Sequence, residues 1–253
     1  MSTDERRQEI INYLMKNNTV SVNSIIELLP SSPATVRRDL DFLEKNGSVT
    51  RSRGYVKFKQ PVVVRTIKMT DEKIAVAKAA AAMIPQGATI SLDSGASTLA
   101  LANQLVNRDD LTIYTNSLSV LNVMAFSTIP TYCAGGILDG RQEAFLGPDA
   151  ESYIRNLHIP ILFLSTTGIR KTQGLVCVTP LQASMKRAFI ESSELVVLLA
   201  DATKFKTDSV RVFAKMSEID TIITDEPLND SEFEHFLEQI GTKLIVANHM
   251  QEK

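Results

Sequence analysis

Residues 32–47 read SPATVRRDLDFLEKNG, and this segment limits what the N-terminal part of the chain can be. Ser32 is a favourable N-cap and Pro33 is tolerated at the first helical position, so the pattern predicts a helix from Pro33 to Asn46. Gly47 would end it, because glycine readily adopts the left-handed conformation at a helix C-terminus. The aliphatic residues that share one face at helical spacing, and that we expect to be buried, are Val36, Leu40 and Leu43.

The other face of this helix has the residue types that a DNA-reading helix needs. Thr35, Arg37 and Arg38 lie near its N-terminal end, where a hydroxyl and two guanidinium groups can reach base edges and phosphates in the major groove. An arginine pair alone is more often part of a solvated face, with ion pairs to carboxylates such as Asp39 or Asp41. The segments on either side of the helix favour DNA binding.

Those flanking segments complete a winged helix-turn-helix. Residues 6–16 have aliphatic side chains at helical spacing, and a second short helix is expected before the turn at Pro30. Residues 49–59 alternate apolar with basic or polar side chains, which predicts a β-hairpin wing whose Arg51 and Arg53 would contact flanking phosphates. We therefore predict a DNA-binding domain over residues 1–58.

Charge and composition agree with this division of the chain. The 253 residues have a formal net charge of −2, but residues 1–60 carry ten Lys and Arg against seven Asp and Glu. No apolar run approaches the roughly 20 residues that cross a bilayer, and the N-terminus lacks the apolar core of a signal peptide. Two isolated cysteines and three scattered histidines indicate neither a disulfide framework nor a metal site. We expect a cytoplasmic protein with no membrane partner, metal or cofactor.

Residues 59–70 lack a clear period and are interpreted as a linker, whereas residues 71–253 alternate helical with strand patterns. Helices are expected between the strands, one of them over 143–156. The predicted strands are continuous apolar runs, typical of strands covered on both faces, and include 88–93, 111–115, 161–165 and 195–200. The sequence thus predicts an α/β fold with a mostly parallel sheet in the larger, C-terminal domain.

Small polar residues follow several of these strands, at the places where ligands of open α/β sheets bind. The loop 93–98 reads DSGAST and opens a helix, so its N–H groups favour an anion such as phosphate. Further junctions of this kind are Thr115-Asn116-Ser117, Ala134-Gly135-Gly136 and Ser165-Thr166-Thr167-Gly168. Each alone can be ordinary cap or turn chemistry, but their repetition at successive strand ends favours a shared pocket. The residues expected to bind a sugar phosphate are Asp93, Ser94, Gly95, Ala96, Ser97, Thr98, Thr115, Asn116, Ser117, Gly135, Gly136, Lys186, Asp201 and Lys204.

Several motifs keep the spacing of a known family. In the N-terminal part they are residues 32–47 and the following Thr50-Arg51; in the larger part they include Asp93-Ser-Gly95-x-Ser97-Thr98, Gly135-Gly136, Met185-Lys186 and Leu199-Ala-Asp201-x-x-Lys204-Phe205. On these motifs the chain resembles the DeoR-type bacterial transcription regulators over nearly its whole length. The resemblance implies a sensor domain with a fold like that of ribose-phosphate isomerases and coenzyme A transferases. It also implies a phosphorylated sugar as inducer or co-repressor.

We therefore expect a DNA-binding transcription regulator, a repressor of a carbohydrate uptake or catabolism operon. The effector phosphate would lie on Ser94–Thr98 and Lys186, with Asp93, Asn116 and Asp201 reading sugar hydroxyls. One small DNA-binding domain makes few base contacts, so we expect a homodimer or homotetramer on double-stranded operator DNA. The alternative is a sugar-phosphate isomerase or transferase that uses Asp93, Asp201 and Lys186 as acid and base. An attached DNA-binding domain gives such catalysis no evident purpose, so no catalytic residue is expected.

Overall fold

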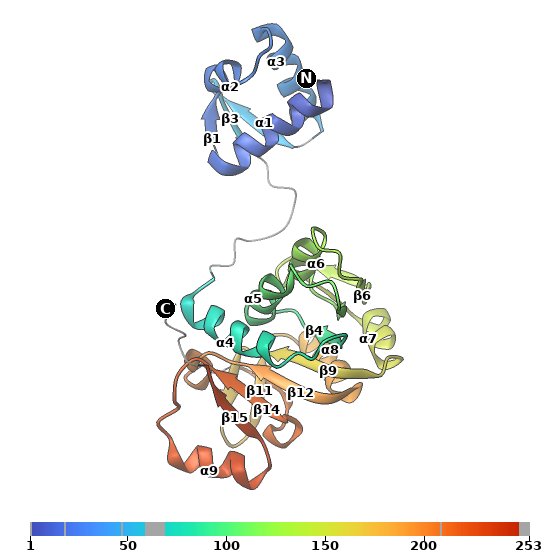
Figure 1. Cartoon of the computed structure of the whole chain (residues 1–253), viewed down its shortest axis with the longest axis vertical. Coiled ribbons are helices and arrows are strands. Elements are labelled where there is room, and N and C mark those ends of the chain that lie inside the picture. Colours follow the sequence, from blue (N-terminus) through green and yellow to red (C-terminus); the bar gives the residue numbers. More distant parts are fainter. Residues whose placement is uncertain (1, 18, 47, 59–68, 208, 248–253) are drawn as a thin grey trace. The chain divides into compact units, whose positions relative to one another are not determined.

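The computed structural model describes residues 2–17, 19–46, 48–58, 69–207 and 209–247 (Figure 1). The chain forms two compact units, residues 1–63 and residues 64–253. We call the described parts of these units the head (2–58) and the sensor domain (69–247). Gly47 and most of the predicted linker, residues 59–68, lie outside the described residues. Within the described chain, no helix is both long enough and apolar enough to cross a membrane.

The head contains helices packed on a small antiparallel sheet. Its elements are α1 (Thr3–Asn17), β1 (Thr19–Ser21), α2 (Val22–Leu28), α3 (Pro33–Lys45), β2 (Val49–Ser52) and β3 (Tyr55–Phe58), with strand order β1-β3-β2. Val36, Leu40 and Leu43 of α3 lie in the core, as their spacing predicts. The side chain of Ser32 caps α3 by accepting the Thr35 N–H at 3.2 Å. The head is thus a winged helix-turn-helix, with β2 and β3 forming the wing.

The sensor domain is built on a sheet in which every pairing is parallel, with strand order β15-β14-β12-β9-β4-β5-β6. Its strands are β4 (Thr89–Leu92), β5 (Thr112–Thr115), β6 (Thr131–Cys133), β9 (Ile159–Ser165), β12 (Ser193–Leu199), β14 (Thr221–Thr224) and β15 (Lys243–Val246). The helices are α4 (Asp71–Ala82), α5 (Ala96–Leu105), α6 (Leu118–Met124), α7 (Pro148–Arg155), α8 (Pro180–Glu191) and α9 (Ser231–Gln239). The predicted α/β fold with a parallel sheet is confirmed.

Two smaller sheets and two short turns of 3₁₀-helix accompany this sheet. An antiparallel hairpin joins β7 (Ile137–Asp139) and β8 (Ala144–Leu146), and an antiparallel sheet joins β10 (Gly168–Arg170), β11 (Gly174–Cys177) and β13 (Arg211–Ala214). The 3₁₀ turns are η1 (Ala202–Phe205) and η2 (Met216–Glu218). The sequence patterns did not predict these three-residue and four-residue strands.

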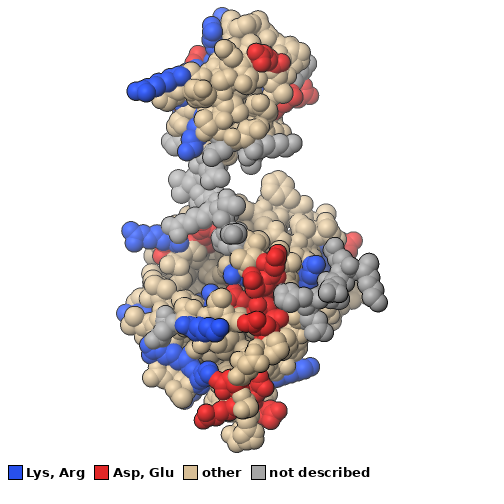
Figure 2. All heavy atoms as spheres, turned by 90° about the vertical axis from the view of Figure 1, so that its left-hand side faces the viewer, with Lys and Arg blue, Asp and Glu red and all other residues tan. Residues whose placement is uncertain are grey.

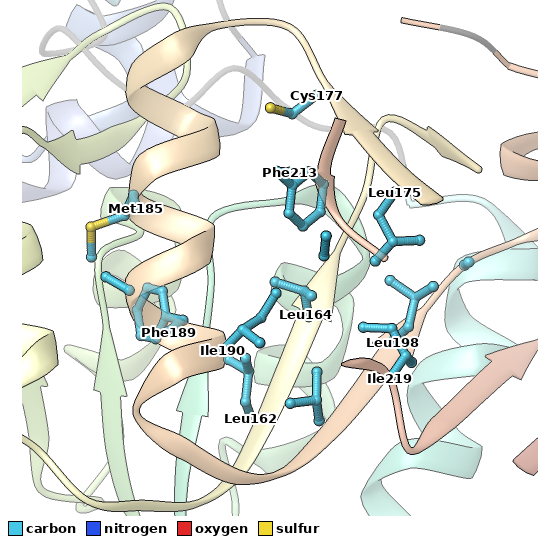
Figure 3. Packing of buried hydrophobic residues seen from close by; sticks show 14 of the residues in the cluster. Leu162, Leu164, Leu175, Cys177, Met185, Phe189, Ile190, Leu198, Phe213 and Ile219 are labelled. Atoms are coloured by element: carbon cyan, nitrogen blue, oxygen red, sulfur yellow. The ribbon is translucent and has the colours of Figure 1, made fainter. Parts of the chain in front are cut away.

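Side chains that alternate along the central strands form two cores, one on each face of the sheet. Phe163 of β9 points into the core made with α4, α5 and α6, whereas Leu162 and Leu164 point into the core made with α7, α8 and α9. Figure 3 shows the second core, where Phe189 and Ile190 of α8 lie against these β9 leucines. Because both faces are covered, the strands are apolar throughout, which explains why they were recognisable in the sequence.

The order of strands creates one reversal in the sheet. From β4 the chain continues to β5 and β6 on one side, and it then returns to β9 on the other side of β4 and continues to β12, β14 and β15. The connections that leave the carboxyl ends of β4 and β9 therefore run in opposite directions. Such a reversal leaves a crevice between the two strand ends, and it is the place where open α/β sheets bind ligands.

The prediction of one helix over 143–156 is wrong. Residues 144–146 instead form β8, which pairs with β7, and α7 begins only at Pro148. Gly147 separates the two with φ +97°, a backbone conformation that a continuous helix does not allow. Pro148 then starts the helix at its first position, where a missing N–H costs nothing.

Replacing Phe189 tests how far the second core stabilises the sensor domain. Phe189→Ala should lower the free energy of unfolding by about 3–5 kcal/mol, because the side chain is completely buried and leaves a cavity. Phe126 is 91% exposed, so Phe126→Ala should change it by no more than about 0.5 kcal/mol. Urea unfolding followed by far-ultraviolet circular dichroism gives both values, and equal midpoints for the two variants would contradict the assignment.

Candidate functional site

The predicted DNA-reading residues lie on the accessible face of α3. Arg37 and Arg38 are exposed, and within the described residues neither forms an ion pair. Asp39 and Asp41, which the alternative interpretation paired with them, are bound to other arginines. In Figure 2, Lys and Arg side chains project mainly from one side of the head and acidic side chains lie mainly on the other. The two arginines are therefore available to an anionic partner such as DNA.

A buried carboxylate fixes α3 against α1. Asp39 is 2% exposed and accepts hydrogen bonds from Arg6 Nε at 2.5 Å and from Arg7 Nε at 2.9 Å. The Arg7 guanidinium also lies 3.6 Å from the centre of the Phe42 ring. No local sequence pattern predicts this clamp, because it joins residues more than 30 positions apart. It sets the orientation of the helix that carries Arg37 and Arg38.

The two wing arginines differ in their surroundings. Arg51 donates to Asp41 at 2.5 Å and to Glu44 at 2.8 Å, so its guanidinium ties the wing to α3. Arg53 is exposed at the turn between β2 and β3, where it has φ +49° and the following Gly54 has φ +84°. Positive φ at both positions is typical of a two-residue hairpin turn, and it places Arg53 at the tip of the wing.

A cavity of about 300 Å³ lies at the crevice between β4 and β9. Seven segments supply its wall, and nearly all of their side chains there are polar or charged. The lining residues are Lys73, Ser94, Gly95, Ala96, Ser97, Ser117, Ser119, Arg141, Gln142, Glu143, Ser165, Thr166, Thr167, Gln182, Lys186 and Lys204. We call this the effector cavity. Among the described residues, no group of three or more His, Cys, Asp or Glu side chains is placed to hold a metal ion.

The N-terminus of α5 opens into the effector cavity without a side-chain cap. Its N-cap is Gly95, which has no side chain to accept the N–H groups of the first turn. An added Cβ at Gly95 would lie 2.1 Å from Ser165 Oγ, so glycine is required here by the close approach of β9. The first turn carries Ser97, which is 4% exposed and lines the cavity. Free N–H groups and the helix dipole make this end of α5 favourable for an anion.

Asp93 and Lys186 form a buried ion pair at the floor of the effector cavity. The Asp93 carboxylate accepts the Ser165 N–H and the Ser165 hydroxyl, both at 3.0 Å, and also the Lys186 ammonium. Lys186 further donates to the Ser165 carbonyl at 2.9 Å. The Lys186 ammonium thus bonds to protein groups. Asp93 is not among the residues that line the effector cavity and lies behind them. The pair joins β4, β9 and α8.

A second group of charges surrounds Asp201. This carboxylate is paired with Lys73 Nζ at 3.0 Å and accepts the Thr203 N–H at 3.1 Å. Burial opposes ionisation of Asp201, but hydrogen bonds from Thr203 and Lys73 outweigh it and lower the pKa of the carboxyl group. Burial also lowers the pKa of Lys204, and the nearby charge of Lys73 adds to this effect. Within the described residues, the Lys204 ammonium has neither an ion pair nor a hydrogen-bond acceptor, although it lines the effector cavity.

The turn of the β7–β8 hairpin supplies a further side of the wall. Arg141, Gln142 and Glu143 line the cavity there, and Gln142 accepts a hydrogen bond from Gln182 of α8 at 2.5 Å. Glu143 is 5% exposed, accepts a hydrogen bond from the Ser119 hydroxyl and has φ +51°. A non-glycine residue in this conformation is strained, and such strain is retained mainly where position matters for function.

The structure brings together half of the residues predicted to bind an effector. Those in the cavity wall are Ser94, Gly95, Ala96, Ser97, Ser117, Lys186 and Lys204. Asp93 and Asp201 lie behind the wall in ion pairs, and the Thr98 hydroxyl bonds to the Asp93 carbonyl at 2.8 Å. Four more of the predicted residues also lie outside the cavity wall: Thr115, Asn116, Gly135 and Gly136. Three of these residues contact other parts of the protein instead. The Thr115 hydroxyl donates to the Leu92 carbonyl, and the Asn116 side-chain amide donates to the Phe145 carbonyl. Gly136 packs against Leu146 and Ala150.

Both halves of the chain match known families. Residues 6–62 match the DeoR-like helix-turn-helix domain, and residues 68–226 match the DeoR C terminal sensor domain. The chain belongs to the DeoR family. The transcriptional repressor AccR of Agrobacterium fabrum is 32% identical over 98% of this chain and 98% of its own length. A putative aga operon transcriptional repressor of Escherichia coli O157:H7 is 30% identical over 97% of this chain and 94% of its own length.

A solved structure shares a smaller part of this DeoR-family chain. Ribose 5-phosphate isomerase A from Methanocaldococcus jannaschii is 16% identical, covers 53% of this chain and 53% of its own length, and has a TM-score of 0.40. The full-length relatives are named as transcription regulators, and the chain is likewise a regulator rather than an enzyme.

Asp39 offers a test of the clamp that orients α3. Asp39→Ala should destabilise the head by about 3–5 kcal/mol, because it leaves Arg6 and Arg7 without their buried partner. The matched control is Asp41→Ala, which removes a carboxylate that is 59% exposed and should cost less than about 1 kcal/mol. Thermal unfolding monitored by circular dichroism compares them, and a similar loss for both would show that the clamp contributes no more than a surface ion pair.

Proposed function

We propose that this chain represses an operon for carbohydrate uptake or catabolism and is controlled by a phosphorylated sugar bound in the effector cavity. The observation that carries the proposal is the combination of an uncapped helix N-terminus with an unpaired lysine in one polar cavity. Relatives support the class of pathway, since one is named for the aga operon and another, 30% identical, is the regulator IolR of Bacillus subtilis. Such a regulator would act in the cytoplasm.

On the DNA side, Thr35, Arg37 and Arg38 would enter the major groove at the N-terminal end of α3. Arg53 at the wing tip would contact a flanking phosphate. Arg51 was predicted to do the same, and its ion pairs with Asp41 and Glu44 suggest that it also keeps the wing aligned with α3. Because one head offers few base-reading side chains, we propose that a homodimer or homotetramer binds symmetric half-sites.

In the effector cavity, the phosphate would lie on the first turn of α5. The hydroxyl groups of Ser94 and Ser97 would donate hydrogen bonds to it, and Lys204, which pairs with no carboxylate of the described residues, would supply positive charge. The sugar would then extend toward the opposite wall, where Gln182 and Glu143 can bond to its hydroxyls. In this arrangement Lys186 acts mainly by holding Asp93 and β9 in place beneath the phosphate.

Arg38 tests the DNA interface. Arg38→Ala should weaken binding to a duplex from the promoter of the protein's own gene by about 1–3 kcal/mol per head, because a bidentate base contact is lost. Arg38→Lys keeps the charge and should retain non-specific binding while losing sequence discrimination. Fluorescence anisotropy against specific and scrambled duplexes measures both, with the thermal shift by sugar phosphates as a control for folding. Unchanged discrimination in Arg38→Ala would remove α3 as the reading helix.

Ser97 tests the effector cavity. Ser97→Glu should place a carboxylate where the phosphate binds, and the first turn of a helix tolerates that charge. We expect the variant to bind the promoter duplex normally and to lose the thermal stabilisation that sugar phosphates give the wild type. Ser97→Ala is the control and should weaken this stabilisation only slightly. If Ser97→Glu responds to sugar phosphates as the wild type does, the phosphate lies elsewhere.

A further inference from the structure

The tip of the wing contains an arginine in a backbone conformation that arginine disfavours. Ser52 and Tyr55 form the last pair of the β2–β3 ladder, so Arg53 and Gly54 alone make up the turn. Their φ angles of +49° and +84° lie in the left-handed region. Asparagine followed by glycine is the usual pair in such a turn, whereas a long side chain at the first position is strained. Arginine is therefore an unfavourable residue for the turn itself.

Within the described part of the head, no ion pair or hydrogen bond of the Arg53 side chain compensates for this strain. The residue is exposed, and its guanidinium has neither kind of partner there. Arg51, two positions earlier, instead bonds to both Asp41 and Glu44 of α3. Strained residues are retained mainly where their position serves a function. An arginine that is strained, exposed and unpaired favours a partner outside the protein.

The wing lies beside the face of α3 that carries Arg38. Asp41 follows Arg38 by three positions and so neighbours it on the helix surface, and the Arg51 guanidinium bonds to Asp41 at 2.5 Å. An α-helix is about 10–12 Å across and fills a major groove of about 12 Å, so an element beside it lies over the phosphate backbone. The turn at Arg53 is two residues beyond Arg51, roughly 7 Å farther along the strand. With α3 in the major groove, the tip would therefore reach the adjoining minor groove.

The minor groove suits a single arginine side chain and distinguishes two classes of base pair. It is about 6 Å wide, too narrow for the strands of the wing but wide enough for one extended side chain. A guanidinium has only donors, and A·T pairs present only the acceptors adenine N3 and thymine O2 there. A G·C pair adds the guanine N2 amino donor, which opposes a guanidinium. A·T-rich minor grooves are also narrow, with an enhanced negative potential that attracts arginine.

We infer that the wing tip inserts Arg53 into the minor groove beside the site of α3 and there selects A·T base pairs. The inference rests on the proposed function, because it requires α3 in the major groove. It goes beyond a contact with a flanking phosphate, which positions the protein but carries no sequence information. Each head would then read base pairs that α3 does not touch, through a residue that the turn alone does not favour.

The test compares two versions of the duplex from the promoter of the protein's own gene, one with adenine and one with 2,6-diaminopurine at every adenine position. Diaminopurine keeps the N6 and N7 groups of the major groove and adds an N2 amino group to the minor groove. By fluorescence anisotropy, the full-length wild type should bind the modified duplex about tenfold more weakly. Arg53→Asn should bind the unmodified duplex about tenfold more weakly than the wild type, and its affinities for the two duplexes should differ by less than about twofold.

Lys57 supplies the matched control, since it is an exposed cation on β3 of the same wing. Lys57→Asn should weaken binding to both duplexes alike and keep the sensitivity of the wild type to diaminopurine. Thermal unfolding of the full chain should give Arg53→Asn a midpoint equal to that of the wild type or about 1–3 °C higher, because asparagine suits the left-handed conformation. A lower midpoint would show that Arg53 stabilises the turn, and it would remove the strain on which the inference rests.

The anisotropy data separate this inference from the proposed function. A wild type that binds both duplexes equally, or an equal loss on the modified duplex for the wild type and Arg53→Asn, would overturn the minor-groove contact alone. Arg53 would then remain on a flanking phosphate. If the wild type does not distinguish the unmodified promoter duplex from a scrambled one, the proposed reading of DNA by α3 is overturned as well.

Discussion

The buried pair of Asp93 and Lys186 is the contact on which the geometry of the sensor domain depends. The strands β4 and β9 end side by side while their connections leave in opposite directions, and Asp93 closes the gap by bonding to the Ser165 backbone and side chain. A buried charge is costly unless it is paired and hydrogen-bonded. Here both conditions hold, so the floor of the cavity is rigid. The uncapped N-terminus of α5 opens into the cavity above this floor.

The head also contains a buried carboxylate that is paired with cations and joins two elements. Asp39 ties α3 to α1 through Arg6 and Arg7, as Asp93 ties β4 to α8 through Lys186. In both units the buried carboxylate engages the cations that build the structure. Within the described residues, Arg37 and Arg38 of α3 and Lys204 of the cavity wall form no ion pair, unlike Arg6, Arg7 and Lys186.

Much of the fold could be predicted because its signals are local. The cap at Ser32, the aliphatic face of α3 and the apolar runs of the parallel strands each depend on neighbours in the sequence. Strands of three residues, such as β7 and β8, have too few positions to show a period, which is why β8 was assigned to a helix. In the cavity, the strand-end loops were predictable from topology.

The lining residues outside those loops carry no such signal in the sequence: Lys73, Ser119, Arg141, Gln142, Glu143 and Gln182. Gln142 and Gln182 meet across 40 positions, and only tertiary packing determines that contact.

The charges of the cavity limit which ligand it can hold. Its wall and floor contain four cations, Lys73, Arg141, Lys186 and Lys204, against three carboxylates, Asp93, Glu143 and Asp201. The N-terminus of α5 adds roughly half a positive charge to this excess of one. A phosphate monoester, with a charge of about −1.5 to −2 near neutral pH, nearly neutralises the sum. An uncharged sugar would leave Lys204 without an acceptor in a half-buried site, and a diphosphate would exceed the available charge. The charge balance therefore supports the proposal that the ligand carries a single phosphate group.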